Sequence, residues 1–147
     1  MAVTVSAYNH NALRFMNGAN APGDAYIVNL YTVLPFIPAA TTKAAAEAGA
    51  TQLATANGYT QNAKALASVT FATVATNGAM FDAADTIWTP TSTDLVANFA
   101  LIYNDTDTND PPLYHYDFGG AITATFSPLV PFSIIWAATG IARSVVV

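Results

Sequence analysis

The chain has no cysteine and few charged residues. Of its 147 residues, 4 are Lys or Arg and 9 are Asp or Glu, which gives a net charge of −5. Without cysteine there is no disulfide scaffold, no cysteine zinc site and no thiol nucleophile. Four basic side chains are too few for an electrostatic grip on nucleic acid, which takes several Lys or Arg per site. We therefore expect no nucleic-acid partner.

Long hydrophobic runs are also missing. A membrane-spanning helix needs about 20 consecutive apolar residues, whereas the two most apolar stretches, 25–40 and 129–142, are shorter and contain proline. The first residues, Met1–Val5, have neither the basic part nor the long apolar part of a signal peptide. We expect no signal peptide and no membrane partner.

Apolar and aromatic residues, by contrast, are abundant. Apolar residues make up 53% of the chain, including 8 Phe, 7 Tyr and 2 Trp, while charged residues make up 9%, against about 25% in an average soluble domain. This composition excludes disorder, and the length suits one domain with a substantial core. A surface so short of charge favours association, so we expect a homo-oligomer, a dimer or a trimer.

The first 23 residues differ from the rest. They are rich in Asn and Gly, and their few apolar residues are isolated, so the segment cannot bury a face by itself. It is either a frayed tail or an arm laid on something else. A mere tail would not need its apolar residues, so we predict an extended N-terminal arm over residues 1–23, ahead of one β-sandwich domain over 24–147. The predicted arm anchors are Leu13, Arg14, Phe15 and Met16.

From residue 24 onwards the pattern is mostly β. Residues 24–34 are β-branched and aromatic and apolar on both faces, which is typical of a strand between layers or inside an oligomer. Residues 41–57 are rich in alanine, with Thr42 as a possible N-cap; they predict one short helix, with an irregular loop as the alternative. Further strands are expected at 65–75, 79–82, 94–103, 113–118, 121–126, 132–137 and 142–147, with turns at Thr76-Asn77-Gly78 and Gly119-Gly120. The predicted fold is all-β, an antiparallel, jelly-roll-like β-sandwich with an extended N-terminal arm and at most one short helix.

Four groups of residues invite a chemical interpretation. The loop Asp105–Asp110 begins like a calcium loop but has Asp110 and Tyr116 where an EF-hand needs Gly and Glu; we interpret it as a solvated hairpin loop, with a different calcium site as the alternative. Asp82 and Asp85 fit turn positions better than an acid–base pair.

His10 and His115 are too isolated in the sequence to form a metal site together. Trp88 and Trp136 either stack on sugars or, as we expect, fill the core. No Gly-x-Ser-x-Gly elbow or phosphate loop occurs, so we expect no enzyme, no catalytic residues, no cofactor and no metal.

Several short motifs follow one another between residues 24 and 147. They are Gly58-Tyr59-Thr60, Phe81-Asp82-Ala83-Ala84-Asp85, Ile87-Trp88, Ala100-Leu101-Ile102-Tyr103-Asn104-Asp105, Tyr116-Asp117-Phe118-Gly119-Gly120, Ile134-Ile135-Trp136 and Gly140-Ile141. This ordered series resembles that of small structural proteins of tailed bacteriophages. The resemblance implies a virion protein, a capsid decoration (cement) protein that binds and stabilises the assembled shell of the major capsid protein.

On that resemblance, the protein would be made in the host cytoplasm and reside on the capsid surface. The arm would reach across a subunit boundary, with Arg14 pairing with a capsid carboxylate. The alternatives are another virion piece (tail, baseplate or head fibre) or a carbohydrate-binding β-sandwich module.

Overall fold

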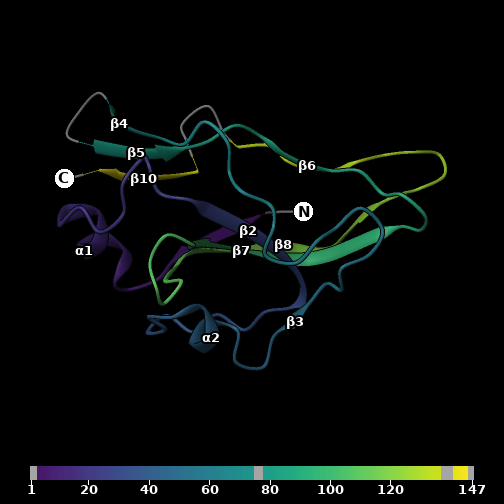
Figure 1. Ribbon diagram of the computed structural model, residues 1–147, viewed down its shortest axis with the longest axis horizontal. Coiled ribbons are helices and arrows are strands. Elements are labelled where there is room, and N and C mark those ends of the chain that lie inside the picture. Colours follow the sequence, from purple (N-terminus) through teal and green to yellow (C-terminus); the bar gives the residue numbers. More distant parts are fainter. Residues whose placement is uncertain (1–2, 75–77, 137–140, 146–147) are drawn as a thin grey trace.

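A computed structural model describes residues 3–74, 78–136 and 141–145 (Figure 1). Within these residues the fold is all-β, as predicted, with ten strands and two short helices. All strand pairs are antiparallel. One layer is a five-stranded sheet, and the other consists of a three-stranded and a two-stranded sheet.

The five-stranded sheet has the strand order β1-β8-β7-β2-β3. Its strands are β1 (Thr4–Ala7), β8 (Pro112–Ala124), β7 (Leu95–Asn104), β2 (Tyr26–Val33) and β3 (Thr51–Gln52). The consecutive strands β7 and β8 pair directly with each other in the middle of this sheet. The resemblance to a jelly roll is therefore limited to two packed antiparallel layers.

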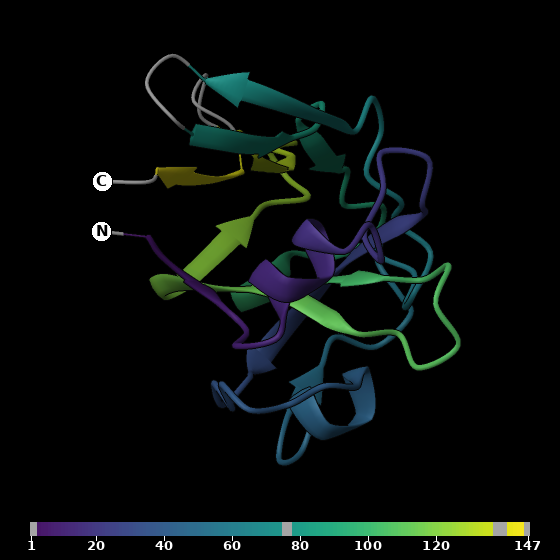
Figure 2. The same ribbon diagram turned by 90° about the vertical axis from the view of Figure 1, so that its left-hand side faces the viewer.

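The second layer lies across one face of this sheet (Figures 1 and 2). Its three-stranded part has the order β10-β5-β4, and its two-stranded part pairs β6 with β9. The bounds are β4 (Thr70–Val74), β5 (Gly78–Asp82), β6 (Thr86–Trp88), β9 (Phe132–Ile134) and β10 (Ala142–Val145). Four of these strands match predicted strands within a few residues, whereas β6 has no predicted counterpart. The predicted turn at 76–78 falls largely outside the described residues, as do parts of the strands predicted at 132–137 and 142–147.

Strand β2 shows why a strand can be apolar on both faces without a second copy of the chain. Its side chains alternate between two cores, because successive residues of a strand point to opposite faces of the sheet. Tyr26, Val28 and Leu30 face the main core between the two layers, while Tyr31 joins a smaller core with Leu34 on the opposite face. The smaller core is covered by residues 34–50, which include the second helix. Both faces of β2 are thus buried within one chain.

The double glycine does not make the predicted turn. Strand β8 runs continuously through Gly119 and Gly120, where two strands were expected. Against the neighbouring strand, Ala97 pairs with Ile122 and Phe99 with Asp117, so one residue on β7 spans four on β8. The glycines adopt φ values of +73° and +149° inside this bulge. Glycine supplies the unusual backbone of a bulge as readily as that of a turn.

The prediction of an extended N-terminal arm over residues 1–23 is wrong for the described part of that segment. It contains strand β1 and the helix α1 (Asn11–Met16), which gives two short helices where at most one was expected. The backbone N–H of Tyr8 donates to Leu113 O, and that of Asn9 donates to Pro38 O. The segment therefore folds onto the rest of the chain, and the boundary predicted after residue 23 does not separate an arm from the sandwich.

The helix predicted within residues 41–57 is confirmed, although it is only one turn long. Helix α2 (Lys43–Ala46) begins as expected, with the hydroxyl of Thr42 accepting a hydrogen bond from Ala45 N at 3.2 Å. Lys43 and Glu47 pair at 3.2 Å one turn apart. Gly49, with φ +77°, follows the helix and helps turn the chain towards β3. In the described chain, neither helix is long and apolar enough to cross a membrane.

Candidate interaction surfaces

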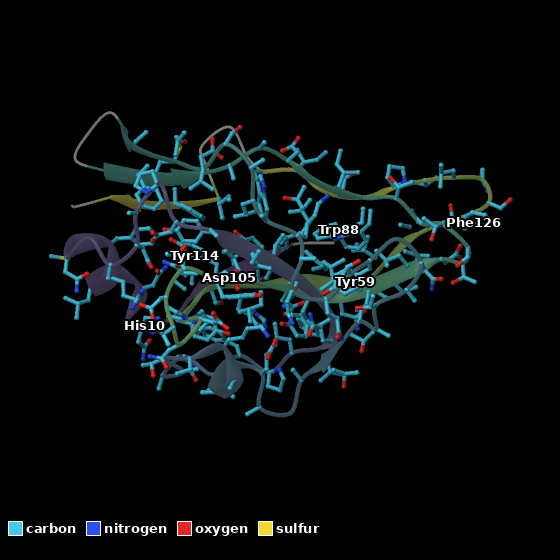
Figure 3. All side chains as sticks on the ribbon, in the orientation of Figure 1. His10, Tyr59, Trp88, Asp105, Tyr114 and Phe126 are labelled. Carbon is cyan, nitrogen blue, oxygen red and sulfur yellow. The ribbon has the colours of Figure 1, made fainter. Side chains whose placement is uncertain are left out.

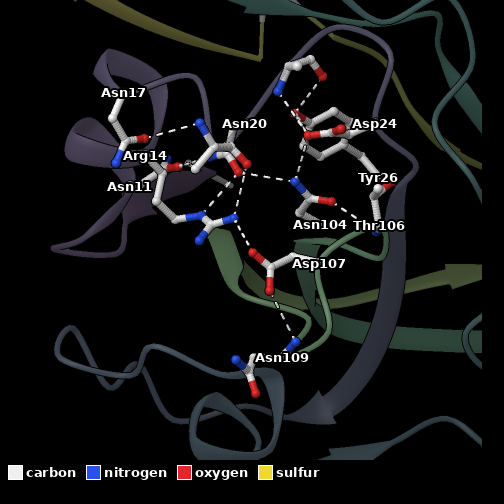
Figure 4. A network of polar contacts seen from close by, with 12 residues as sticks. Asn11, Arg14, Asn17, Asn20, Asp24, Tyr26, Asn104, Thr106, Asp107 and Asn109 are labelled. Atoms are coloured by element: carbon white, nitrogen blue, oxygen red, sulfur yellow. Dashed lines mark hydrogen bonds and ion pairs between the residues drawn. The ribbon is translucent and has the colours of Figure 1, made fainter.

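Arg14 holds the N-terminal segment against the loop between β7 and β8 (Figure 4). Its Nη2 donates to Asp107 Oδ2 at 2.8 Å and to Ala19 O at 3.0 Å, and its Nε donates to Asn20 Oδ1 at 3.2 Å. The hydrogen bond from Arg14 and the hydrogen bond from Asn109 N hold the pKa of Asp107 below its ordinary value. The carboxylate that Arg14 pairs with is therefore in its own chain, which corrects its predicted role as an anchor on a neighbour.

Three buried asparagines complete this junction. Asn20 donates to Asn11 Oδ1 at 3.2 Å, and Asn104 donates to Asn20 Oδ1 at 3.2 Å and to Asp24 Oδ2 at 2.8 Å. The three asparagines are at most 2% exposed. Because buried amides are costly unless they are hydrogen-bonded, this network specifies how the N-terminal segment docks. Its polar groups bond to one another, which is the arrangement of a structural joint.

The loop Asp105–Asp110 has the hydrogen bonds of tight turns. Asp107 Oδ1 accepts from Asn109 N at 3.2 Å, and Asn104 Oδ1 accepts from Thr106 N at 2.9 Å. Among the described residues, no group of three or more His, Cys, Asp or Glu is placed to hold a metal ion. Turn formation by Asp and Asn side chains accounts for the composition that resembles a calcium loop.

The two aspartates considered as an acid–base pair both bond to backbone. Asp82 Oδ1 accepts from Ala83 N at 2.9 Å, and Asp85 Oδ1 accepts from Trp136 N at 3.0 Å. The second contact ties the end of β9 to the start of β6. In the described structure both carboxylates accept hydrogen bonds from backbone N–H groups, Asp82 from the next residue and Asp85 from a residue 51 positions away.

The two histidines lie in or beside the smaller core. His115 is 5% exposed, and its Nε2 lies 2.9 Å from Leu34 O, with the rings of Phe36 and Phe99 beside it. His10 precedes α1, and burial of its ring, together with the charge of Arg14, lowers its pKa. Each histidine therefore has a packing role that its sequence neighbours did not reveal.

Both tryptophans fill the main core. Trp88 is 4% exposed and packs edge-on against Phe132 at 5.8 Å. Trp136 is 8% exposed, and its indole N–H donates to Ala84 O at 3.0 Å. A sugar-binding platform needs exposed ring faces, so neither tryptophan supplies one. The core interpretation made from the sequence is confirmed for both residues.

Large exposed apolar side chains mark three surfaces. The first, which we call the α1 face, consists of Leu13 (63% exposed) and Met16 (85% exposed). These two predicted anchors point into solvent and remain available to a partner. The third apolar anchor, Phe15, instead packs on Phe71 and Phe81 of the chain's own second layer, with ring centroids 5.0 and 6.0 Å away.

The second surface is the tip formed by residues 125–131, between β8 and β9, with Phe126, Leu129 and Val130 half exposed. Three hydrogen bonds hold its shape. Phe126 N donates to Asp94 Oδ1 at 2.8 Å, Val130 N donates to Thr125 O at 2.9 Å, and Thr125 Oγ1 donates to Pro128 O at 2.6 Å. Figure 3 shows Phe126 at one end of the molecule's long axis, while α1 lies at the other end in Figure 1.

The third surface is an open apolar groove of about 340 Å³ between β1, β8 and the end of β9. Its lining includes Val3, Val5, Phe118, Ile122, Ile135 and Trp136. Val3, Val5 and Ile135 are 57%, 44% and 75% exposed. The groove lies beside the outer edge of the five-stranded sheet.

Neither the tip nor the groove is predicted from the sequence. Both draw on the longest uncharged part of the chain, because no Asp, Glu, Lys or Arg occurs between Asp117 and Arg143. That gap is a signal visible in the sequence. Its apolar residues were interpreted as core strands, since hydropathy does not distinguish a buried Phe132 from an exposed Phe126 six residues earlier.

Comparison of the chain with protein-family models, curated proteins and solved structures finds no match.

Proposed function

We propose that this protein is a virion structural protein, a capsid decoration subunit that bridges neighbouring subunits of an assembled major capsid shell. The observation that supports the proposal most is the placement of exposed apolar residues at opposite ends of the long axis, Leu13 and Met16 at one end and Phe126, Leu129 and Val130 at the other. A protein with one contact surface binds a neighbour, whereas a protein with a contact at each end can bridge two. The ordered motifs of residues 24–147 support the phage assignment.

The mechanism would be geometric. A ligand that binds only the assembled shell stabilises it by its binding free energy. Two weak contacts on one rigid body reinforce each other, because the second contact forms at a high effective concentration once the first is made. The tip fits this mechanism because its hydrogen bonds hold its shape before binding, which reduces the entropy lost on docking.

The test is co-sedimentation of the purified protein with undecorated shells of the major capsid protein from the same genome. We expect saturable binding by the wild type. Phe126→Ser and Leu129→Ser at the tip, and Met16→Ser on the α1 face, should each weaken binding at least tenfold. Val33→Ser is the matched control, since Val33 is 46% exposed but lies away from both ends, at the end of β2.

Two results would contradict the proposal. Wild-type protein that does not sediment with shells would remove the capsid partner. Variants at both ends that bind like the control would remove the bridging contacts. The number of copies in purified particles then separates a decoration protein, present in hundreds, from a tail, baseplate or head-fibre piece, present in few.

A further inference from the structure

Strand β1 is the outer strand of the five-stranded sheet at the side where the groove opens. An edge strand presents backbone groups on which another strand can pair, and proteins usually protect such edges with charge, proline or very short length. The opposite edge follows this rule, since β3 has only two residues. β1 has four residues, Thr4–Ala7, of which none is charged and none is proline.

The face of β1 that borders the groove is apolar and open. Val5 pairs with Tyr116 and Ala7 with Tyr114, so these side chains share the face that leads into the main core. The two β1 residues are nevertheless exposed, as is Ile135 across the groove. An added strand alongside β1 would bring its own side chains over this groove, because side chains project perpendicular to the sheet.

The distribution of charge favours a second copy of the same chain as the occupant. Two copies with a net charge of −5 each repel one another unless they meet where carboxylates are absent. The chain has no Asp, Glu, Lys or Arg before Arg14 or between Asp117 and Arg143, and these two segments supply the exposed groove residues. Asp117 pairs with Thr4, so it points to the opposite face of the sheet from Val5.

We propose that two copies of this chain associate by antiparallel pairing of β1 with β1 across a two-fold axis, joining their five-stranded sheets edge to edge. An antiparallel pair of identical strands is self-complementary, as a two-fold interface requires. A ladder of four residues is only about 14 Å long. Stable interfaces bury about 800 Å² per partner, so we expect a dimer that dissociates on dilution. This inference goes beyond the proposed function and does not depend on a capsid.

The test is sedimentation velocity of the purified full chain over a wide range of concentration. We expect the mass to rise from the monomer value of 15.3 kDa towards twice that value. Val5→Lys places a cation from each copy at the centre of the paired strands and should weaken dimerisation at least tenfold. Val33→Lys is the matched control, with the same change of charge at a side chain of almost equal exposure, 46% against 44%. It should dimerise like the wild type.

Two further measurements locate the interface. Hydrogen exchange of the amides of residues 4–7 should slow in concentrated samples, and amides of β3 should not change. Added salt should strengthen the dimer, because it screens the repulsion between two acidic copies. If Val5→Lys fails to give a native circular dichroism spectrum, Ala7→Lys tests the same face at the end of the strand.

The outcomes that overturn the inference are distinct from failure of the proposed function. A wild type that stays monomeric at high concentration, or a Val5→Lys variant that dimerises like Val33→Lys, rules out the β1 dimer. If the isolated wild type is monomeric but Val5→Lys loses shell binding, the groove binds a segment of the shell instead of a second copy, and the dimer is again ruled out. A β1 dimer that fails to bind shells would leave this inference standing and remove the capsid function.

Discussion

Replacing Phe15 by alanine tests whether the first 23 residues belong to the folded domain. Phe15 is half-buried, and its ring packs edge-on against Phe71 at 5.0 Å and lies 6.0 Å from Phe81. A fully buried Phe→Ala change costs about 3–5 kcal/mol, and an aromatic pair adds about 0.5–1.5 kcal/mol beyond the buried area. For a half-buried ring with these contacts we expect the free energy of unfolding to fall by roughly 2–3 kcal/mol.

The matched control is Leu13→Ala on the same helix. Leu13 is 63% exposed, so its truncation should change the free energy of unfolding by less than about 0.5 kcal/mol. Urea unfolding measures both, and with a slope of about 1–3 kcal/mol per M the Phe15 variant should lose about 1 M in its midpoint while the slope stays constant. Equal midpoints for the two variants would refute the packing of α1 on the second layer and restore an arm that is independent of the domain.

Three further predictions rest on particular residues. Gly58 has φ +85°, and a Cβ there would lie 2.0 Å from Thr89 O, whereas at Gly49 (φ +77°) the nearest atom would be 3.8 Å away. In urea unfolding, Gly58→Ala should therefore lower the free energy of unfolding by several kcal/mol, and Gly49→Ala only by about 1–2 kcal/mol from backbone strain. Equal losses would contradict the close approach of Thr89 O to Gly58. Burial is the largest cause of the lowered pKa of His10, so the unfolded state binds the His10 proton first, and the stability of the fold should fall as the pH drops from about 8 to about 5. His10→Gln should reduce this dependence of stability on pH, measured by thermal unfolding. An unchanged pH dependence would assign it to other groups. Burial raises the pKa of all seven tyrosines, that of Tyr114 to about 12. Their contribution to stability is therefore complete below the ordinary tyrosine pKa of 10.0 and is lost as the pH rises through their pKa values in the folded protein. Absorbance titration of the native protein should show no tyrosinate at pH 10, and ionisation of several tyrosines at that pH would contradict their burial.

The parts of the fold that the sequence predicts are those whose signal is local. The run at residues 24–34 and the alternation at 94–103 correspond to β2 and β7, because β-branched and aromatic side chains and period-two burial are visible in a few consecutive residues. The N-cap of α2 is equally local, since Thr42 bonds to a backbone N–H three residues later. Each of these features depends on near neighbours in the chain.

The parts that were missed depend on distant partners. Arg14 pairs with a carboxylate 93 residues away, and Asn104 bonds to an asparagine 84 residues away. A segment whose apolar residues are isolated looks like an arm when those partners are unknown. The double glycine was misread for a related reason. Gly119-Gly120 permits either a turn or a bulge, and the register with β7 on the far side of the ladder decides between them.

The scarcity of charge also acquires a different meaning from the structure. The strand at 24–34 also favours association, because two apolar faces place a strand either between layers or inside an oligomer, but residues 34–50 cover the second face of β2 within the chain. Much of the rest of the surface is uncharged without being apolar, as in the exposed Thr, Gln and Asn residues of 51–62. What singles out an interaction surface here is therefore the position of large apolar side chains. The groove beside β1 is not lined by Leu13, Met16 or the tip residues 125–131, so a dimer formed through β1 would present two tips and two α1 faces to a shell.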